Sequence, residues 1–469
     1  MKMSARHCRI LIAATCVAAC ENQPTVPSTS IIPTIDASVA TLNSQNVLSA
    51  TVSVRVRDAD SVAVRFAIAD VASSSDSVSP AVKVTADSAV IPVLGLFPSR
   101  RYTLRAVAYS ARGNAVGNAM ELTTDALPPD LPKYSASGVD PSPGYVVFAA
   151  GKYGLVIDNA GRVVWYRRFP NGPGLNFMAE PTGHYVARPT SPDVMQPDEW
   201  TEFDALGKTV RSLPCALGLT SRPHDLIAES DGSYWLMCDE TRTMDLTDVG
   251  GVAGARVTGT SVQHVSAQGK ILFQWSAFDH FDITDGELSN RTGQNVNWTH
   301  GNALDFDVDG NLLVSFRNLS EITKIDVASG AIMWRMGGRR NQMTFVDSSS
   351  HIFSGQHSAR VNSFGELTIL DNLGTVGESR AERYVVDAAM HTARLVHYYA
   401  SIPGVVTAIG GSVQALAGGR TLVSFGTAGR VEEYDADGHV MWRIDGNAGY
   451  VFRAQRILSL YKPGVGTRR

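Results

Sequence analysis

The sequence predicts an all-β protein in which a β-sandwich precedes a six-bladed β-propeller. Three observations support this: short alternating strands up to about residue 124, a proline-rich break after them, and a loose four-strand repeat beyond the break. The 469 residues, 44% of them hydrophobic and 42 of them glycine, suffice for two domains with many turns. The net charge of -4 provides no basic field for phosphates, so we expect no nucleic-acid partner.

The N-terminus has the pattern of an export signal over residues 1–19. A basic start is followed by a short apolar run, which is too short to remain in a bilayer as a span. The sequence Val17-Ala18-Ala19-Cys20 resembles the bacterial lipobox, so we expect Cys20 to carry a lipid and to be the only membrane attachment. This places the protein in the bacterial cell envelope, in the periplasm or at the cell surface. The alternative is an ordinary signal peptide that is cleaved nearby.

Residues 20–34 are rich in Pro, Thr and Ser and are expected to be a tether. Once the signal segment is removed and Cys20 is lipidated, Cys215 and Cys238 are the remaining cysteines. An oxidising compartment allows them to form one disulfide, although two free buried thiols are the alternative.

Residues 35–125 show short alternating strands with turns every 8 to 12 residues, which is typical of a β-sandwich. The run Gly95-Leu96-Phe97-Pro98, followed by the strand 102–109, resembles the end of a fibronectin type III module, within the wider Ig-like class. Residues 126–140 are expected to be a linker, because closely spaced prolines prevent a regular hydrogen-bonded ladder.

The region 141–465 contains a repeated unit of four antiparallel strands, as in a propeller blade. The clearest copy spans 300–336, and a second copy near the C-terminus repeats its Leu-Val-Ser-Phe and Met-Trp-Arg segments. Partial copies elsewhere give a count of six blades. Seven is the alternative, because the first blade is poorly marked.

Comparison of the two clearest copies singles out polar residues that the fold does not need. Gly426 stands where Arg317 stands, and Gly411 stands where Asn302 stands. We therefore interpret Arg317 as a ligand-binding residue within an apolar strand. A surface-facing arginine is the alternative.

Hairpin geometry predicts which of these residues share a face. A two-residue turn at Asp309-Gly310 pairs positions whose numbers sum to about 619 and places Asn302 opposite Arg317. His300 lies two residues from Asn302 and so points to the same side of the sheet.

Three histidines occupy comparable places in three hairpins. Each precedes a turn glycine by an even number of residues: His224, His300 and His357, ahead of Gly232, Gly310 and Gly365. We expect the histidines to meet near the start of the innermost strands, where the channel opens. Asp239 and Asn372 follow their glycines by the same interval as Arg317 and are candidate supports for His224 and His357.

The arginine indicates the chemistry of this cluster. A permanent guanidinium charge beside neutral imidazoles opposes a cation and favours an oxyanion such as sulfate or phosphate. One histidine would attack the transferred group, while the other histidines and Arg317 neutralise its charge. The sequence has no GxxxxGK[ST] loop and no Gly-x-Ser-x-Gly elbow.

The stretch "THGNALDFDVDGNLLVSFRNLSEITKIDVASGAIMWRMGG", with "FSGQHSARVNSFGELTILDN" after it, resembles the PAPS-independent arylsulfate sulfotransferase family. The similarity is clear over 224–372 and weak over the rest of the propeller. It implies an exported six-bladed propeller that uses no metal and no nucleotide cofactor. The fibronectin-like domain and the lipid anchor are not general features of that family.

The resemblance also implies roles for individual residues. His357 matches the histidine that is transiently sulfurylated, and His300 and Arg317 match the pair that binds the sulfuryl group. Asn302 and His224 match further active-site positions. The implied reaction is a ping-pong exchange, through a sulfohistidine, from a small aryl sulfate donor to a phenolic acceptor.

Two other functions remain open at this stage. One is a metal-dependent hydrolase built on the three histidines, which Arg317 disfavours. The other is a lipid-anchored scaffold or glycan-binding propeller without catalysis. The sequence does not identify the physiological donor and acceptor, the balance of transfer against hydrolysis, the membrane that holds the anchor, or whether the protein is a homodimer.

Overall fold

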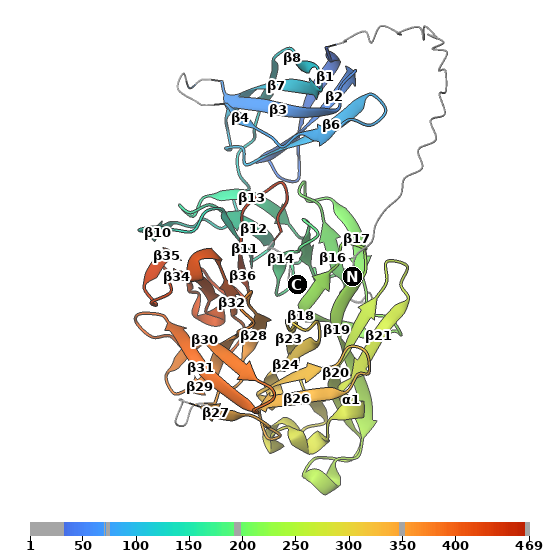
Figure 1. The fold of residues 1–469 in the computed structure, drawn as a ribbon, viewed down its shortest axis with the longest axis vertical. Helices are drawn as coiled ribbons and strands as arrows, with labels where there is room; N and C mark the ends of the chain where they lie inside the picture. The colour runs from blue at the N-terminus through green and yellow to red at the C-terminus, as the bar shows by residue number, and fades with distance from the viewer. Residues whose placement is uncertain (1–31, 70, 72–75, 192–197, 347–351, 465–469) are drawn as a thin grey trace, which may run out of the picture.

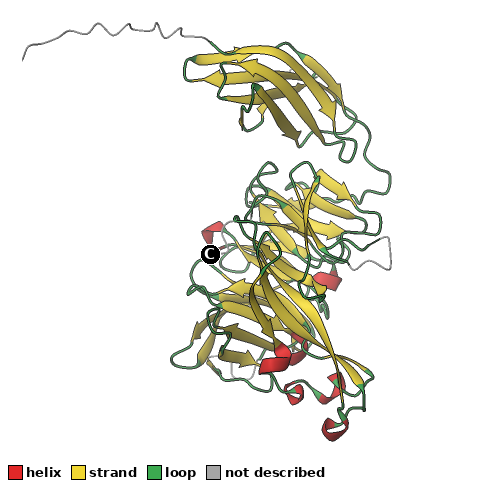
Figure 2. Ribbon diagram, turned by 90° about the vertical axis from the view of Figure 1, so that its right-hand side faces the viewer, coloured by secondary structure: helices red, strands yellow, loops and turns green. Residues whose placement is uncertain are grey.

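A computed structural model describes residues 32–69, 71, 76–191, 198–346 and 352–464. The expected signal peptide, Cys20 and nearly all of the expected tether lie outside these residues. The described chain is all-β, and Figure 2 shows its helices as short red turns at the edges of the strands. These helices are η1 (Thr247–Val249), α1 (Ala277–His280), η2 (Ile283–Asp285), η3 (Leu288–Asn290), η4 (Arg317–Leu319), η5 (Ala417–Gly419) and η6 (Gly426–Ala428). Within the described residues, no helix has the length and apolarity required to cross a membrane.

The N-terminal unit consists of two sheets that share one hydrophobic core. The first sheet contains β1 (Thr34–Leu42), β2 (Ser49–Arg57) and β6 (Ser88–Leu94). The second contains β3 (Ser61–Ile68), β4 (Ser77–Val78), β5 (Val82–Lys83), β7 (Arg101–Ser110), β8 (Gly113–Val116) and β9 (Met120–Thr123). The alternating valines of β2 are buried while the residues between them face outward, as the sequence pattern predicts.

The N-terminal unit packs directly on the larger unit. Val47 donates its backbone N–H to Tyr166 Oη at 3.1 Å, and the Arg162 guanidinium lies 3.9 Å from the centre of the Phe97 ring. The stretch 126–140, which we expected to be a linker, buries Leu131 in a core of the larger unit and contributes a strand to it.

The larger unit contains six sheets of four or five main strands. In chain order of their innermost strands they are: β14 (Phe177–Ala179), β15 (Tyr185–Ala187), β16 (Trp200–Phe203) and β17 (Thr209–Leu213); β18 (Thr220–Ala228), β19 (Tyr234–Met244), β20 (Ala255–Val265), β21 (Ile271–Ser276) and β22 (Asn295–Asn297); β23 (Gly301–Phe306), β24 (Leu312–Phe316), β25 (Glu321–Ile325) and β26 (Ile332–Gly337); β28 (His357–Val361), β29 (Leu367–Thr375), β30 (Glu378–Asp387), β31 (Thr392–Ala400) and β27 (Thr344–Val346); β32 (Ser412–Ala415), β33 (Thr421–Ser424), β34 (Val431–Tyr434), β35 (Val440–Ile444) and β10 (Ala136–Gly138); β36 (Ala454–Ile457), β11 (Tyr145–Ala150), β12 (Tyr153–Ile157) and β13 (Val163–Arg168).

The sheets form a closed, propeller-like ring. Figure 1 shows the innermost strands gathered around a common centre, with the outer strands of each sheet at the periphery. Two strand pairings join the ends of the chain: β36 pairs with β11, and β10 pairs with β35. The first and last segments of the unit therefore share sheets, which fixes the ring without a further element.

The hairpin of β23 and β24 differs from its predicted register by one residue. Leu304 pairs with Val314, so that paired numbers sum to 618, and Gly310 has a positive φ of 80° and donates its N–H to Asp307 O. The loop has three residues with a left-handed glycine, not two. The prediction that Asn302 faces Arg317 was therefore wrong.

Two further details of this hairpin explain the difference. Asn302 lies in a bulge, where its side chain is buried and donates to the Gln356 carbonyl at 2.7 Å. Arg317 is not in the middle of a strand but is the first residue of η4.

Candidate active site

His357 begins β28 and is almost completely buried. Its Nδ1 lies 2.8 Å from Asn372 Oδ1 and 3.2 Å from the Gly355 carbonyl oxygen, both of which can only accept hydrogen bonds. Nδ1 therefore carries the proton, and Nε2 has the lone pair. The Gly410 N–H donates to Nε2 at 3.3 Å.

Asn372 is held so that its carbonyl oxygen must face His357. Its Nδ2 donates to the carbonyls of Thr407 at 2.8 Å and of Gly410 at 2.9 Å. The burial of His357 lowers its pKa to about 4; the hydrogen bond from Asn372 raises this pKa and the Arg317 charge lowers it. His357 is therefore a neutral imidazole at physiological pH.

His300 stands directly before β23 with a positive φ of 50°, a strained conformation for a residue with a side chain. The Asn297 amide Nδ2 donates to its Nδ1 at 2.6 Å, so the proton of the neutral ring is on Nε2. Burial, with the charges of Arg222 and Arg317, lowers the pKa of His300 to about 2. This ring can donate a hydrogen bond without carrying a charge.

His224 lies within β18 and contacts the other two histidines directly or through one phenylalanine. Its ring centre is 4.8 Å from that of His300, and Phe452 lies 5.7 Å from His224 and 5.8 Å from His357. Burial, followed by the charge of Arg222, lowers the pKa of His224 well below its usual value. Among the residues that the structure describes, no group hydrogen-bonds to its buried Nδ1.

Arg317 presents a guanidinium that no acid neutralises. It donates to Asn318 Oδ1 at 3.1 Å and to the Ala408 carbonyl at 3.0 Å, and no carboxylate of the described chain lies within ion-pair distance. Ala408 and Gly410 belong to one short segment, so the same backbone contacts Arg317 and His357. Figure 1 shows the strands that carry these residues meeting at the centre of the ring.

Arg222 is a second cation at the site and was not predicted. It is 4% exposed and forms an ion pair with Asp239. Asp239 was expected to support His224, but its carboxylate contacts Arg222 instead. Asn297 and Phe452 were also missed; Asn297 and Arg222 lie three and two residues before histidines of the site, which is a weak sequence signal.

The comparison of Gly426 with Arg317 has a structural basis. Gly426 begins η6 as Arg317 begins η4, so the two copies make the same turn. A Cβ atom on Gly426 would lie 2.3 Å from the Ile409 carbonyl oxygen. The last sheet therefore requires glycine here, whereas the turn itself accepts arginine.

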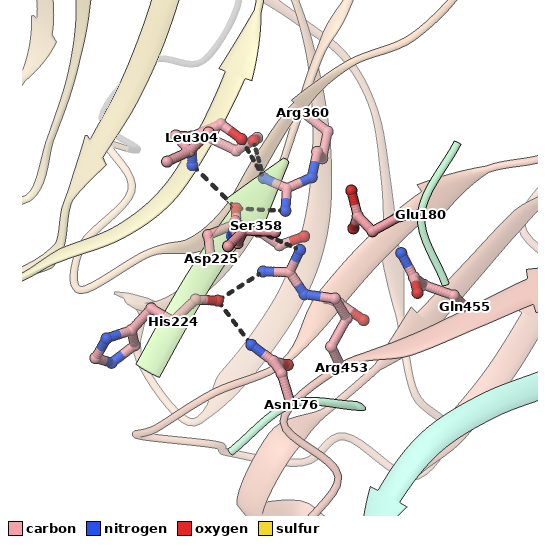
Figure 3. A network of polar contacts seen from close by, with 12 residues as sticks. Asn176, Glu180, His224, Asp225, Leu304, Ser358, Arg360, Arg453 and Gln455 are labelled. Atoms are coloured by element: carbon pink, nitrogen blue, oxygen red, sulfur yellow. Dashed lines mark hydrogen bonds and ion pairs between the residues drawn. The ribbon is translucent and has the colours of Figure 1, made fainter. Parts of the chain in front are cut away.

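A buried ionic network lies next to the histidines (Figure 3). Asp225 accepts from Arg360 at 2.6 Å, from Arg453 at 3.1 Å and from the Leu304 N–H at 3.0 Å. Arg453 also donates to the His224 carbonyl at 3.3 Å. The network connects β18, β23, β28 and the segment before β36, and so fixes the strands that present the histidines.

Cys215 and Cys238 are joined in a disulfide, with their Cα atoms 6.2 Å apart. Cys238 lies on β19, one residue before Asp239. The disulfide thus anchors the segment before β18 to the strand behind it.

The fold and the site together define an all-β, propeller-like protein with neutral histidines and uncompensated arginines at its centre. The sequence model of the arylsulfotransferase (ASST) family matches residues 220–447, which contain all three histidines and both arginines. The chain belongs to this family.

No curated protein matches the chain in a sequence search. Among solved structures, a protein of unknown function from Bacteroides caccae is 12% identical, with a TM-score of 0.43, over 67% of this chain and 98% of that chain. A streptogramin B lyase is 12% identical, with a TM-score of 0.39, over 67% and 84%. Virginiamycin B lyase from Staphylococcus aureus is 11% identical, with a TM-score of 0.36, over 66% and 88%.

Proposed function

We propose that the protein is an aryl-sulfate sulfotransferase that moves a sulfuryl group from an aryl sulfate to a phenol through a sulfohistidine on His357, without PAPS. The observation that carries the proposal is the state of His357. Its Nδ1 proton is held by two acceptors, its Nε2 keeps a lone pair, and its pKa of about 4 leaves it unprotonated at neutral pH.

In the first step, Nε2 of His357 attacks the sulfur of the donor. An N–S bond forms, the S–O bond to the aryl group breaks, and the electron pair leaves with the phenolate. The Nδ1 proton stays on the ring, between Asn372 Oδ1 and the Gly355 carbonyl. The sulfurylated ring therefore keeps a positive charge, which makes the N–S bond easy to break.

In the second step, a phenolate oxygen of the acceptor attacks the same sulfur. An S–O bond forms, the N–S bond breaks, and His357 returns to its neutral form. The proton lost by the acceptor replaces the proton that the released phenol takes up. The two steps are equivalent in reverse, so one arrangement of residues serves both.

Arg317 and His300 stabilise the charge of the moving group. The guanidinium offers donors to the sulfuryl oxygens, and the neutral His300 ring donates through Nε2–H. The same two residues disfavour the protonation of His357, so the anion site and the nucleophile support each other. A metal ion would have to bind beside two arginines, which opposes the metal-dependent alternative.

We further propose that the six sheets are six propeller blades and that the N-terminal unit is a fibronectin type III-like sandwich. The hydrogen bond from the Phe97 N–H to Tyr102 Oη, at 2.7 Å, supports the second assignment because it resembles the tyrosine corner of such domains. Export and lipid attachment at Cys20 stay proposals from the sequence.

The test is to incubate the protein with 4-nitrophenyl sulfate and phenol and to follow both nitrophenol and phenyl sulfate. We expect equal amounts of the two products from the wild type and neither from His357→Ala. Nitrophenol without phenyl sulfate would indicate hydrolysis, and unchanged release by His357→Ala would remove His357 as the nucleophile.

A further inference from the structure

A polar cavity of about 280 Å3 adjoins the histidine cluster. Two of its lining residues also belong to the site: Asn297, which donates to His300, and Arg222, which stands two residues before His224. The proposed transfer reaction accounts for the sulfuryl group but assigns nothing to this cavity.

The charge of the cavity is not balanced. Arg222 and Arg256 contribute two guanidiniums, and Asp239, bonded to Arg222, contributes the one carboxylate among the lining residues. The buried Nε of Arg222 has no hydrogen-bond acceptor within the described parts of the chain. The cavity therefore has one positive charge in excess and one unused buried donor.

The rest of the lining is hydrophilic and suits a small polar group. The Thr241 and Thr258 hydroxyls lie 2.9 Å apart, and the amides of Asn295 and Asn297 are exposed. The apolar surface lies elsewhere, where Phe452 contacts His357 and His224, with Tyr450 behind it at 6.4 Å. A bare aromatic ring has no apolar partner in the cavity, whereas a carboxylate has several donors.

We propose that this cavity binds a carboxylate carried by the phenolic substrate, so that carboxylated phenols are preferred as sulfuryl acceptors. The proposal rests on the proposed transferase function. A singly charged carboxylate matches the single excess charge, and guanidiniums bind such groups through paired hydrogen bonds.

Direct binding tests the proposal independently of catalysis. Calorimetric titration would compare 3-hydroxybenzoate, 4-hydroxybenzoate and 4-hydroxyphenylacetate, each with its neutral amide. We expect at least one acid to bind about tenfold more tightly than its amide. The preference should disappear in Arg256→Gln, an exposed residue of β20 that contacts none of the histidines, and persist in Arg394→Gln, an exposed arginine of β31.

Equal binding of every acid and its amide would overturn the proposal, and so would a preference that Arg256→Gln leaves intact. Transfer from 4-nitrophenyl sulfate to phenol, measured on the same preparations, separates this result from the transferase function. If transfer to phenol fails, the transferase proposal fails, while the binding comparison still decides what the cavity recognises.

Discussion

Replacing Asn372 by aspartate should move the pH dependence of the reaction by about three units. The amide oxygen lies 2.8 Å from His357 Nδ1, so the new carboxylate would face the imidazole at a charge separation of about 4 Å. At an effective dielectric constant of about 20, this attraction is worth about 4 kcal/mol for the protonated ring, or about three pKa units. The pKa of His357 would rise from about 4 to about 7.

The assay is the pH profile of kcat/KM for nitrophenol release between pH 5 and 9, with samples quenched in alkali. The wild type should be flat on its acid side, because His357 is already unprotonated, whereas Asn372→Asp should be half-maximal near pH 7. Asn362→Asp is the matched control, because two equivalent turns of the chain have aspartate at that position: Asp307 and Asp435. A flat profile in Asn372→Asp would refute the assignment of the Nδ1 proton and of the nucleophile.

Three further outcomes follow from the structure. Arg317→Gln should lower kcat by about 10²- to 10³-fold, because it removes the charge nearest the moving group, and kinetics of nitrophenol release would measure this; a loss below tenfold would contradict the role. His357 binds protons less readily when folded than its usual pKa of 6.5 implies, so stability should fall from pH 6.5 to 4 by up to about 3 kcal/mol. His357→Gln should flatten this fall in denaturant titrations at the two pH values, and an unchanged slope would contradict the assigned pKa. Asp225→Asn should cost about 3 to 5 kcal/mol in the same titrations, because two arginines lose their shared carboxylate; a change below 1 kcal/mol would contradict the importance of the network.

The periodicity of the sequence was sufficient to predict the strands and the positions of the histidines. An even spacing from a turn glycine holds in any hairpin, because side chains alternate along a strand. His224, His300 and His357 therefore meet at the centre as predicted from their spacing. The pairing of Asn372 with His357 was reached by the same counting.

The register of the β23 hairpin could not be predicted in this way. A glycine within a turn is compatible with a two- or a three-residue loop, and a single extra residue shifts every pair. Asn302 was therefore placed opposite Arg317, whereas a bulge directs it to Gln356.

The partner of Asp239 was beyond sequence reasoning for another reason. Arg222 lies in the same sheet as His224 and competes for the same carboxylate, and a charged partner wins over a neutral ring. The segment 407–410, which supports both Arg317 and Asn372, has no periodic pattern at all.

The most direct measurement is mass spectrometry of the protein quenched in alkali during turnover of an aryl sulfate, followed by peptide mapping. We predict the mass of one added SO3 group on the peptide that contains His357, its removal when phenol is supplied, and its absence in His357→Ala. Turnover without this adduct, or with the group on another residue, would contradict the assignment of His357 as the residue that carries the sulfuryl group.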